Sequence, residues 1–152
     1  MRTSIRGCVT YTVKQFKDPT HLSVYIDFLK ESGKELEKQY PVFKNWWRTR
    51  LDIYCKKGRV MICFRDKEPV GIMLSKLGRS TFDPQITILQ QTLLYAKPNT
   101  RAAYHLMLDF LDFGKNHADH IITMIGENTN IKRQSLEKLG FKKIEELYRI
   151  EV

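Results

Sequence analysis

The sequence predicts one α/β (α+β) domain, residues 1–152, in which a mixed central sheet of about six or seven strands carries helices on both faces. Three observations support this prediction. The length of 152 residues suits one domain, and an apolar fraction of 42% is enough to build a core. A β-rich hairpin lies in the middle of the chain. A strand, a break, a helix and another strand follow it, which is typical of a parallel βαβ unit.

The chain is basic, with a formal net charge of +9. This charge favours an anionic partner such as a nucleic acid, an acidic protein or a phosphorylated cofactor, although basic proteins without such a partner are also common. The basic residues are scattered from Arg2 to Arg149, and no long run of like charges marks a nucleic-acid-binding tail.

The three cysteines are Cys8, Cys55 and Cys63, and no CxxC pair occurs. This odd, dispersed set indicates neither a disulfide framework nor a zinc site, so we expect no bound metal and a reduced, cytoplasmic setting. The sequence contains no apolar run of the roughly 20 residues that span a membrane, and no signal-peptide core at its start.

The first part of the chain predicts a strand followed by helical pieces. Val9–Phe16 alternates and is rich in β-branched and aromatic residues. Thr20 is expected to cap a helix, which Gly33 ends or kinks, and a second piece stops before Pro41. One face of the first helix carries Leu22, Tyr25, Phe28 and Leu29.

A third helical segment, Phe43–Cys55, has a heavy aromatic face that includes Trp46 and Trp47. Basic residues at Arg48, Arg50, Lys56 and Lys57 flank this face. Such a combination binds single-stranded nucleic acid in some proteins, whereas in most helices large aromatic residues belong to the core.

Val60–Phe64 and Val70–Leu77 predict a hairpin, with the polar segment 65–69 as its turn. Gly71, inside the second strand, indicates a bulge or a close approach of another backbone. Leu77–Pro84 is expected to form the loop that leads to the next strand.

The stretch Ile86–Phe113 is the central feature of the sequence. Ile86–Ala96 predicts a long strand, and its last four residues are all apolar, as in a strand buried on both faces. The segment 97–100 breaks the strand, and a helix begins near Arg101 and closes at Gly114. A strand that leads into a helix N-terminus forms a ready anion-binding site. The predicted core face of the helix is Ala103, Leu106, Met107, Phe110 and Leu111.

The last part of the chain predicts a strand, a helix and a strand. Ile121–Ile125 is a short buried strand. Asn128 or Asn130 is expected to cap the helix Ile131–Leu139, and Gly140 follows its end. The tail, Phe141–Val152, alternates and is expected to form a final strand.

This order of elements resembles the GNAT superfamily of N-acetyltransferases over almost the whole chain. The hairpin Val60–Ser75 is similar to the second and third strands of the family, with Gly71 where a glycine is common. Leu94–Arg101 is similar to the fourth strand and the start of the pyrophosphate loop. Asn128–Phe141, which ends in Glu-Lys-Leu-Gly-Phe, resembles the closing helix of the family and is the most specific match.

The resemblance implies that acetyl-CoA binds as co-substrate. Its pantetheine arm would pair with the backbone of Leu94, Tyr95 and Ala96, and Asn128 or Asn130 would also contact it, with Asn130 assigned to the site. The pyrophosphate loop of the family reads Arg or Gln, two residues, Gly, one residue, then Gly or Ala. It corresponds here to Arg101, Ala102, Ala103, Tyr104, His105 and Leu106.

Tyr104 and Leu106 stand where the family has small residues. Glycines there let backbone N–H groups reach the pyrophosphate without a side chain between them. The two larger side chains either point into the core and leave the amides accessible, or fill the site.

The resemblance assigns no catalytic residue. The family often has a glutamate as general base on the fourth strand, where this chain has Gln90 or Gln91, and a tyrosine as general acid on the last helix, where it has Leu136. An amide cannot accept the proton. Glu127 and Tyr148 are candidate replacements, and a structural role is the alternative for each.

His117, Asp119 and His120 lie between a helix and a strand but lack further metal ligands nearby, and His105 either faces the cofactor phosphates or lies on the helix surface.

The leading function is N-acetylation of an amine on a macromolecular or small acceptor. The net charge favours an acidic protein or a nucleic acid as the acceptor, and Trp46, Trp47 and the final strand would form the substrate wall. The alternatives are a non-catalytic binding protein on the same fold, such as a phage virion or host-takeover factor, and a basic nucleic-acid-binding domain. The sequence does not indicate an oligomeric state.

Overall fold

The structure is a computed structural model that describes residues 8–39, 46–124, 131–144, 148, 150 and 152. In this part of the chain the strands form one sheet in the order β1-β2-β3-β4-β5. The strands are β1 (Tyr11–Phe16), β2 (Arg59–Arg65), β3 (Glu68–Arg79), β4 (Thr87–Ala96) and β5 (His120–Ile122). The helices are η1 (Pro19–Tyr25), α1 (Ile26–Gln39), α2 (Trp46–Lys57), α3 (Ala102–His117) and α4 (Arg133–Lys138).

The sheet is mixed, as the sequence predicts. Strands β1 to β4 are antiparallel to their neighbours, and β5 runs parallel to β4, so β4, α3 and β5 form the predicted βαβ unit. The expected number of six or seven strands is too high, since the described residues form a sheet of five. The predicted final strand, Phe141–Val152, lies partly outside the described residues, and the residues of this segment that the structure describes are not in a strand.

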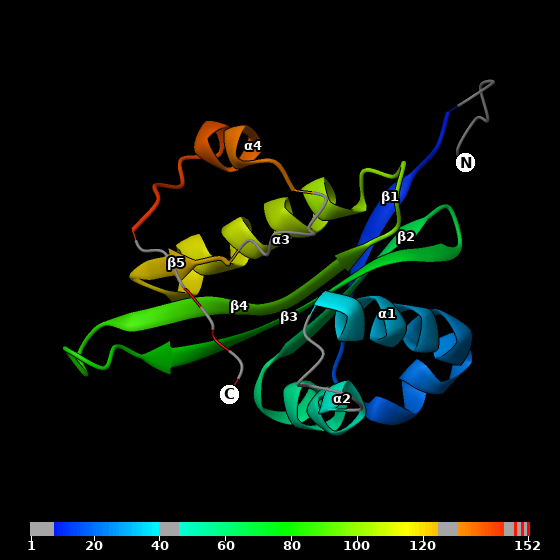
Figure 1. Cartoon of the computed structure of the whole chain (residues 1–152), viewed down its shortest axis with the longest axis horizontal. Coiled ribbons are helices and arrows are strands. Elements are labelled where there is room, and N and C mark those ends of the chain that lie inside the picture. The colour runs from blue at the N-terminus through cyan, green and yellow to red at the C-terminus, as the bar shows by residue number, and fades with distance from the viewer. Residues whose placement is uncertain (1–7, 40–45, 125–130, 145–147, 149, 151) are drawn as a thin grey trace.

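Helices cover both faces of the sheet, which confirms the predicted architecture. Helices α1 and α2 lie on one face, and α3 and α4 lie on the other (Figure 1). Alternating side chains of the strands supply the two cores. Val60, Ile62 and Leu74 pack with η1, α1 and α2, whereas Met61, Met73 and Leu89 pack with α3 and Leu136 of α4.

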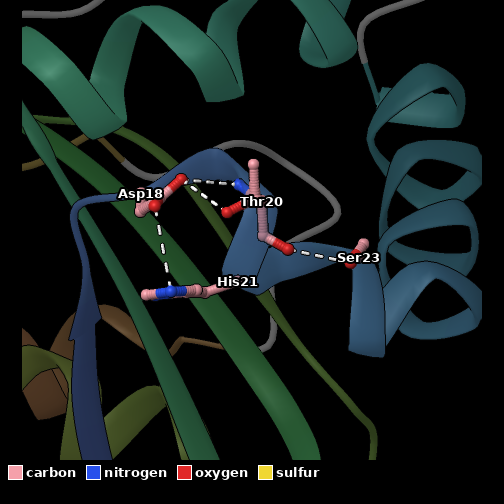
Figure 2. A network of polar contacts seen from close by, with 4 residues as sticks. All are labelled: Asp18, Thr20, His21 and Ser23. Carbon is pink, nitrogen blue, oxygen red and sulfur yellow. Dashed lines mark hydrogen bonds and ion pairs between the residues drawn. The ribbon is translucent and has the colours of Figure 1, made fainter.

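The chain leaves β1 through a capped turn of 3-10 helix, shown in Figure 2. Oδ1 of Asp18 accepts hydrogen bonds from the backbone N–H of Thr20 at 2.9 Å and from its hydroxyl at 2.7 Å. Asp18 is therefore the cap, and the assignment of Thr20 to this role was wrong. An aspartate before Pro19 caps a helix well, because its carboxylate accepts from the free N–H groups of the first turn.

Two glycines that were expected to end helices lie inside continuous ones, so the predicted helix ends at Gly33 and Gly114 were wrong. Helix α1 passes through Gly33 to Gln39, and α3 passes through Gly114 to His117. A glycine inside a helix costs about 1 kcal/mol relative to alanine. At Gly114 close packing compensates this cost, because a Cβ atom there would collide with the side chain of Ile121 in β5.

The hairpin of β2 and β3 is longer than the sequence indicates. Strand β3 continues to Arg79, so the first residues of the predicted loop Leu77–Pro84 belong to the strand. Its register with β4 shifts between Leu74 and Ser75, where Leu74 lies opposite Leu93 and Ser75 opposite Gln91. Thr92 is thus the additional residue of a β-bulge in β4.

The remaining boundaries differ by a few residues from those predicted. Helix α2, Trp46–Lys57, continues past the predicted end at Cys55, and residues 43–45 of the predicted helix lie outside the described residues. Strand β5 begins one residue early, at His120. The N-cap of α4 is Lys132 rather than Asn128 or Asn130, which lie outside the described residues. Gly140 follows α4 with a φ of +100°, the conformation expected of a glycine after a helix.

Arg59 of β2 connects the sheet to the middle of α3. Its Nη2 lies 3.4 Å from Oδ2 of Asp109, and its guanidinium carbon lies 3.7 Å from the ring centre of Phe113. Burial lowers the pKa of Arg59 and raises the pKa of Asp109, in each case against the attraction between the two charges. Desolvation therefore outweighs the ion pair. Nε and Nη1 of Arg59 and Oγ of Ser75 are buried without a hydrogen-bond partner among the described residues.

Candidate functional site

The turn from β4 into α3 is built by local hydrogen bonds. The backbone N–H of Lys97 donates to the carbonyl of Val70 in β3 at 2.8 Å, so β4 stays attached to the sheet to its last residue. Asn99 has a φ of 61°, which asparagine tolerates better than most residues. The hydroxyl of Thr100 donates to the carbonyl of Lys97 at 2.7 Å and fixes the direction in which α3 begins.

The N-terminus of α3 presents backbone N–H groups for which the described part of the chain offers no acceptor. The N–H of Arg101 donates to the hydroxyl oxygen of Tyr11 at 3.1 Å, and the N–H of Ala102 lies 3.4 Å from Oγ1 of Thr100. The first helical bond runs from His105 to Arg101. Among the described residues nothing accepts from the N–H groups of Ala103 and Tyr104, and N–H groups at these positions point out of the helix end.

Positive charge also accumulates at this helix end. The first turn of α3 contains no acidic residue that would compensate the helix dipole. The guanidinium of Arg101, the N-cap residue, lies 4.9 Å from the ring centre of Tyr104. A cation at a helix N-terminus is unfavourable without a counterion, so both the dipole and Arg101 favour a bound anion.

His105 is held in place by an aromatic contact. Its ring stacks on that of Tyr11, with centroids 4.6 Å apart and planes 15° apart. Burial, followed by the charge of Arg101, lowers the pKa of His105. The imidazole is therefore neutral near pH 7 and adds no fixed charge to the helix end.

The two large residues at glycine positions of the loop lie on opposite sides of α3. Leu106 is 1% exposed and belongs to the core, whereas Tyr104 is 43% exposed beside Arg101. Space for Leu106 comes from the sheet. A Cβ atom at Gly71 of β3 would lie 2.8 Å from Cβ of Ala102 and 3.0 Å from Cδ1 of Leu106. The glycine in β3 thus permits the close approach that a glycine in the helix would otherwise provide.

Strand β4 has an open edge beside this helix end. It pairs with β5 only over Ile88–Gln90, while β3 covers its other edge as far as Ala96. In the described part of the chain no strand lies along the β5 side of β4 from Gln91 to Tyr95. An edge of this kind offers its backbone N–H and C=O groups to an extended ligand.

The predicted pantetheine contacts Leu94, Tyr95 and Ala96 lie on this half of β4. Their side chains point into the two cores, so only the backbone is available for a ligand. The hydroxyl of Tyr95 donates to Oε1 of Glu31 in α1 at 3.3 Å. Burial, followed by the charge of Glu31, raises the pKa of Tyr95 to about 12, so the phenol keeps its proton at neutral pH.

The residues considered for catalysis are not brought together. Gln91 is 4% exposed, and its Oε1 accepts hydrogen bonds from the hydroxyl of Thr123 and the N–H of Met124. Leu136 is buried in the core, and Tyr148 is 88% exposed. Glu127 and Asn130 lie outside the described residues, as does Asn128.

Trp46 and Trp47 form the start of α2, which fixes their place in the fold but not their role. The Nδ1–H of His117 donates to the carbonyl of Phe113 within α3 at 2.9 Å, a local contact. Among the described residues, no three side chains of His, Cys, Asp or Glu converge on a possible metal site, and no helix is both long and apolar enough to cross a membrane.

Sequence reasoning did not identify two residues of the site. Tyr11 lies in β1 and reaches the N-terminus of α3 across the sheet, and Thr92 lies at the bulge, where its hydroxyl is 2.7 Å from that of Tyr54 in α2. Both contacts join segments far apart in the sequence. Neither has a local pattern that would have indicated it.

Comparison with solved structures identifies the fold. A Trypanosoma brucei acetyltransferase superposes with a TM-score of 0.67 at 14% identity, covering 94% of this chain and 100% of that chain. The aminoglycoside N-acetyltransferase AAC(6')-Iy in complex with CoA superposes with a TM-score of 0.64 at 12% identity, covering 98% and 99%. The chain has the GNAT fold.

The GNAT fold is not restricted to proteins named as enzymes. A transcriptional regulator from Bacillus halodurans C-125 superposes with a TM-score of 0.69 at 15% identity, covering 94% of this chain and 100% of that chain. No protein-family model and no curated protein sequence matches the chain. At these identities the likeness establishes the arrangement of the elements, and activity is argued from the site.

Proposed function

We propose that the protein is an acetyl-CoA-dependent N-acetyltransferase that transfers the acetyl group to an amine. One observation carries this proposal. The unused N–H groups of Ala103 and Tyr104, together with Arg101, lie directly beside the open edge of β4. The first group suits a pyrophosphate and the second an extended amide-containing chain, and CoA has both in this order. The proposal is supported by a similar solved structure, that of AAC(6')-Iy, which contains bound CoA.

The residues fit the ligand because the glycine positions of the loop do not obstruct it. Leu106 is turned into the core, and Tyr104 lies beside Arg101 with its N–H unused. The side chains of Leu94 and Tyr95 are also turned away from the edge. The pyrophosphate would therefore contact the start of α3, and the pantetheine amides would pair with the backbone of β4.

Acetyl-CoA supplies the activated acyl group as a thioester. In the transfer the amine nitrogen bonds to the carbonyl carbon, the bond from carbon to sulfur breaks, the amine loses a proton and the thiolate gains one. The contribution of the chain would be to hold the thioester beside the acceptor amine, since proximity alone lowers the barrier substantially. Gln91, which precedes the bulge, is an amide that cannot accept a proton, so we assign no general base. The net charge of +9 favours an acidic protein or nucleic acid as acceptor.

Calorimetric titration with acetyl-CoA tests the proposal. The wild-type protein should bind with micromolar affinity, and Ala103→Glu should abolish binding, because a carboxylate would occupy the anion site. Leu108→Glu is the matched control, since it places the same charge on an exposed position of the same helix. The proposal fails if wild type does not bind at millimolar acetyl-CoA, or if both variants bind equally well.

The second candidate is a protein that binds CoA or its thioester without turnover. The residues at the two usual catalytic positions favour this second candidate. Gln91 is buried and its Oε1 is occupied by hydrogen bonds, and Leu136 is part of the core. Release of the CoA thiol distinguishes the two candidates. Thiol release that requires an added amine supports the enzyme, and tight binding without release on a panel of small amines, acidic proteins and nucleic acids supports the binding protein.

A further inference from the structure

Strands β4 and β5 part at Gln91. The parallel ladder pairs Ile88 with His120 and Gln90 with Ile122, and it ends there. The bulge in β4 follows at Thr92. Gln91 thus lies at the inner end of the open edge on which the proposed pantetheine site depends.

The side chain of Gln91 contacts the first two residues beyond β5. Its Oε1 accepts from the hydroxyl of Thr123 and, at 3.3 Å, from the backbone N–H of Met124. Leu89 packs with α3, and side chains alternate along a strand, so Gln91 points to the α3 face of the sheet. The chain that leaves β5 is therefore bonded to a side chain of β4 above the sheet and not to the backbone of β4.

The orientation of this amide is fixed by its partners. A backbone N–H can only donate, so the atom that faces Met124 has to be the oxygen. Gln91 is 4% exposed, and its Oε1 is the acceptor for both donors in the described structure. The contact thus ties the first residues after β5 to a buried side chain of β4.

We propose that Gln91 is a positioning residue that sets the separation of β4 from the chain leaving β5 and so keeps the inner end of the pantetheine site open. The inference rests on the proposed function. Without the carboxamide, Thr123 and Met124 have no acceptor on β4 other than its backbone, and pairing with that backbone closes the edge. The phosphates bind at the other end of β4 and do not depend on this contact.

The experiment titrates two ligands, CoA and adenosine 3′,5′-bisphosphate, into wild type and three variants. Gln91→Leu removes the acceptor at similar volume, and Gln91→Glu retains oxygens that can accept from both partners. Gln90→Leu is the matched control, because it changes the same residue type one position earlier, where the side chain points to the other face. Circular dichroism and thermal unfolding establish that each variant is folded.

Gln91→Leu should weaken CoA binding at least tenfold and leave adenosine 3′,5′-bisphosphate binding within about twofold of wild type, a difference of about 1.4 kcal/mol between the two ligands. Gln91→Glu should recover most of the loss, and Gln90→Leu should bind both ligands as wild type does. Equal CoA affinity in Gln91→Leu and wild type overturns the proposal, and so does an equal loss of both ligands.

Amide hydrogen exchange tests the contact without any ligand. The N–H of Met124 should exchange faster in Gln91→Leu than in wild type or Gln90→Leu, and unchanged exchange overturns the positioning role. If wild type binds neither CoA nor the bisphosphate, the proposed function fails, and the exchange experiment still decides whether Gln91 holds this segment.

Discussion

Gly71 is the residue on which the contact between α3 and the sheet depends most directly. Its missing Cβ leaves space for Ala102 and Leu106, the two residues that bring the start of α3 against β3. An added methyl group would lie 2.8 Å from Cβ of Ala102, which is too close for two carbon atoms. Because Cβ of Ala102 is fixed to the backbone, the helix itself would have to move.

We predict that Gly71→Ala lowers the free energy of unfolding by about 1–3 kcal/mol. Urea-induced unfolding measures this change. Gly78→Ala in the same strand is the control, since a Cβ atom at Gly78 meets nothing within 4 Å and should be neutral or slightly stabilising. Equal stability of the two variants would show that the contact between Gly71 and α3 is looser than described.

His105 gives the protein a predictable response to acid. Burial and the charge of Arg101 lower its pKa in the folded state. The unfolded chain, with a histidine pKa of about 6.5, then binds a proton before the folded protein does. The contribution of His105 to stability is therefore constant above about pH 6.5 and decreases as the pH falls from there towards the lower pKa of the folded protein.

Unfolding measured from pH 7.5 to 5 should show this loss in wild type and a smaller one in His105→Phe, which keeps a ring against Tyr11 but does not titrate. Parallel profiles for the two proteins would mean that His105 is as easily protonated in the folded state as in the unfolded chain.

At the scale of the elements, the sequence predicts most of the fold because local patterns determine most of it. The hairpin, the βαβ unit and most of the core face of α3 follow from alternation and from the helical period, although Ala102 rather than Leu111 belongs to the core. The error at Gly114 has a physical cause. This glycine is a helix breaker by propensity, but inside α3 it packs closely against Ile121 of β5, and propensity contains no information on packing.

The candidate site is less predictable than the fold. Arg101–Leu106 follows from the strand–break–helix pattern and the resemblance, and the structure places these residues at the start of α3. Tyr11 and Gln91 act through contacts with Arg101 and Met124, which lie elsewhere in the sequence. Such contacts depend on the register of the sheet, which a single sequence does not specify.

Substitution of Arg59 shows whether charge or packing joins the sheet to α3. Desolvation outweighs its attraction to Asp109, and two of its nitrogens lack a partner in the described structure. We therefore predict that the double variant Arg59→Met with Asp109→Leu, which replaces both charges by apolar side chains, is neutral or raises the free energy of unfolding by about 1 kcal/mol. Arg59→Ala should instead lower it by about 2 kcal/mol, because it leaves a cavity against Phe113.

Urea-induced unfolding of both variants measures these effects. A loss of stability in the double variant as large as that in Arg59→Ala would indicate that the ion pair itself holds α3 on β2.

At the scale of the whole molecule, the net charge of +9 is compatible with binding either acetyl-CoA or a nucleic acid. The salt dependence of the affinity distinguishes the two. Acetyl-CoA carries few charges, so its affinity should fall by less than about tenfold between 50 and 200 mM salt. A nucleic-acid-binding protein that makes many phosphate contacts would lose about 10³-fold or more in affinity over the same range.

Fluorescence anisotropy with a labelled single-stranded oligonucleotide measures the second case. We expect weak binding. Tight binding with a steep salt dependence would instead favour nucleic acid as acceptor or partner.

The small residue Gly71 in β3 lies against Ala102 and Leu106 in α3, and this contact determines which substitutions the crossing of the two elements tolerates. The limit at this crossing applies to the combined volume of Gly71, Ala102 and Leu106, and not to any one position. A protein with Gly71→Ala should therefore regain stability when Ala102 is also reduced to glycine, although glycine at position 102 alone should cost stability, as it does inside helices in general. The two positions should thus vary as a pair, so that the residue in the strand sets which residue the first turn of the helix can carry.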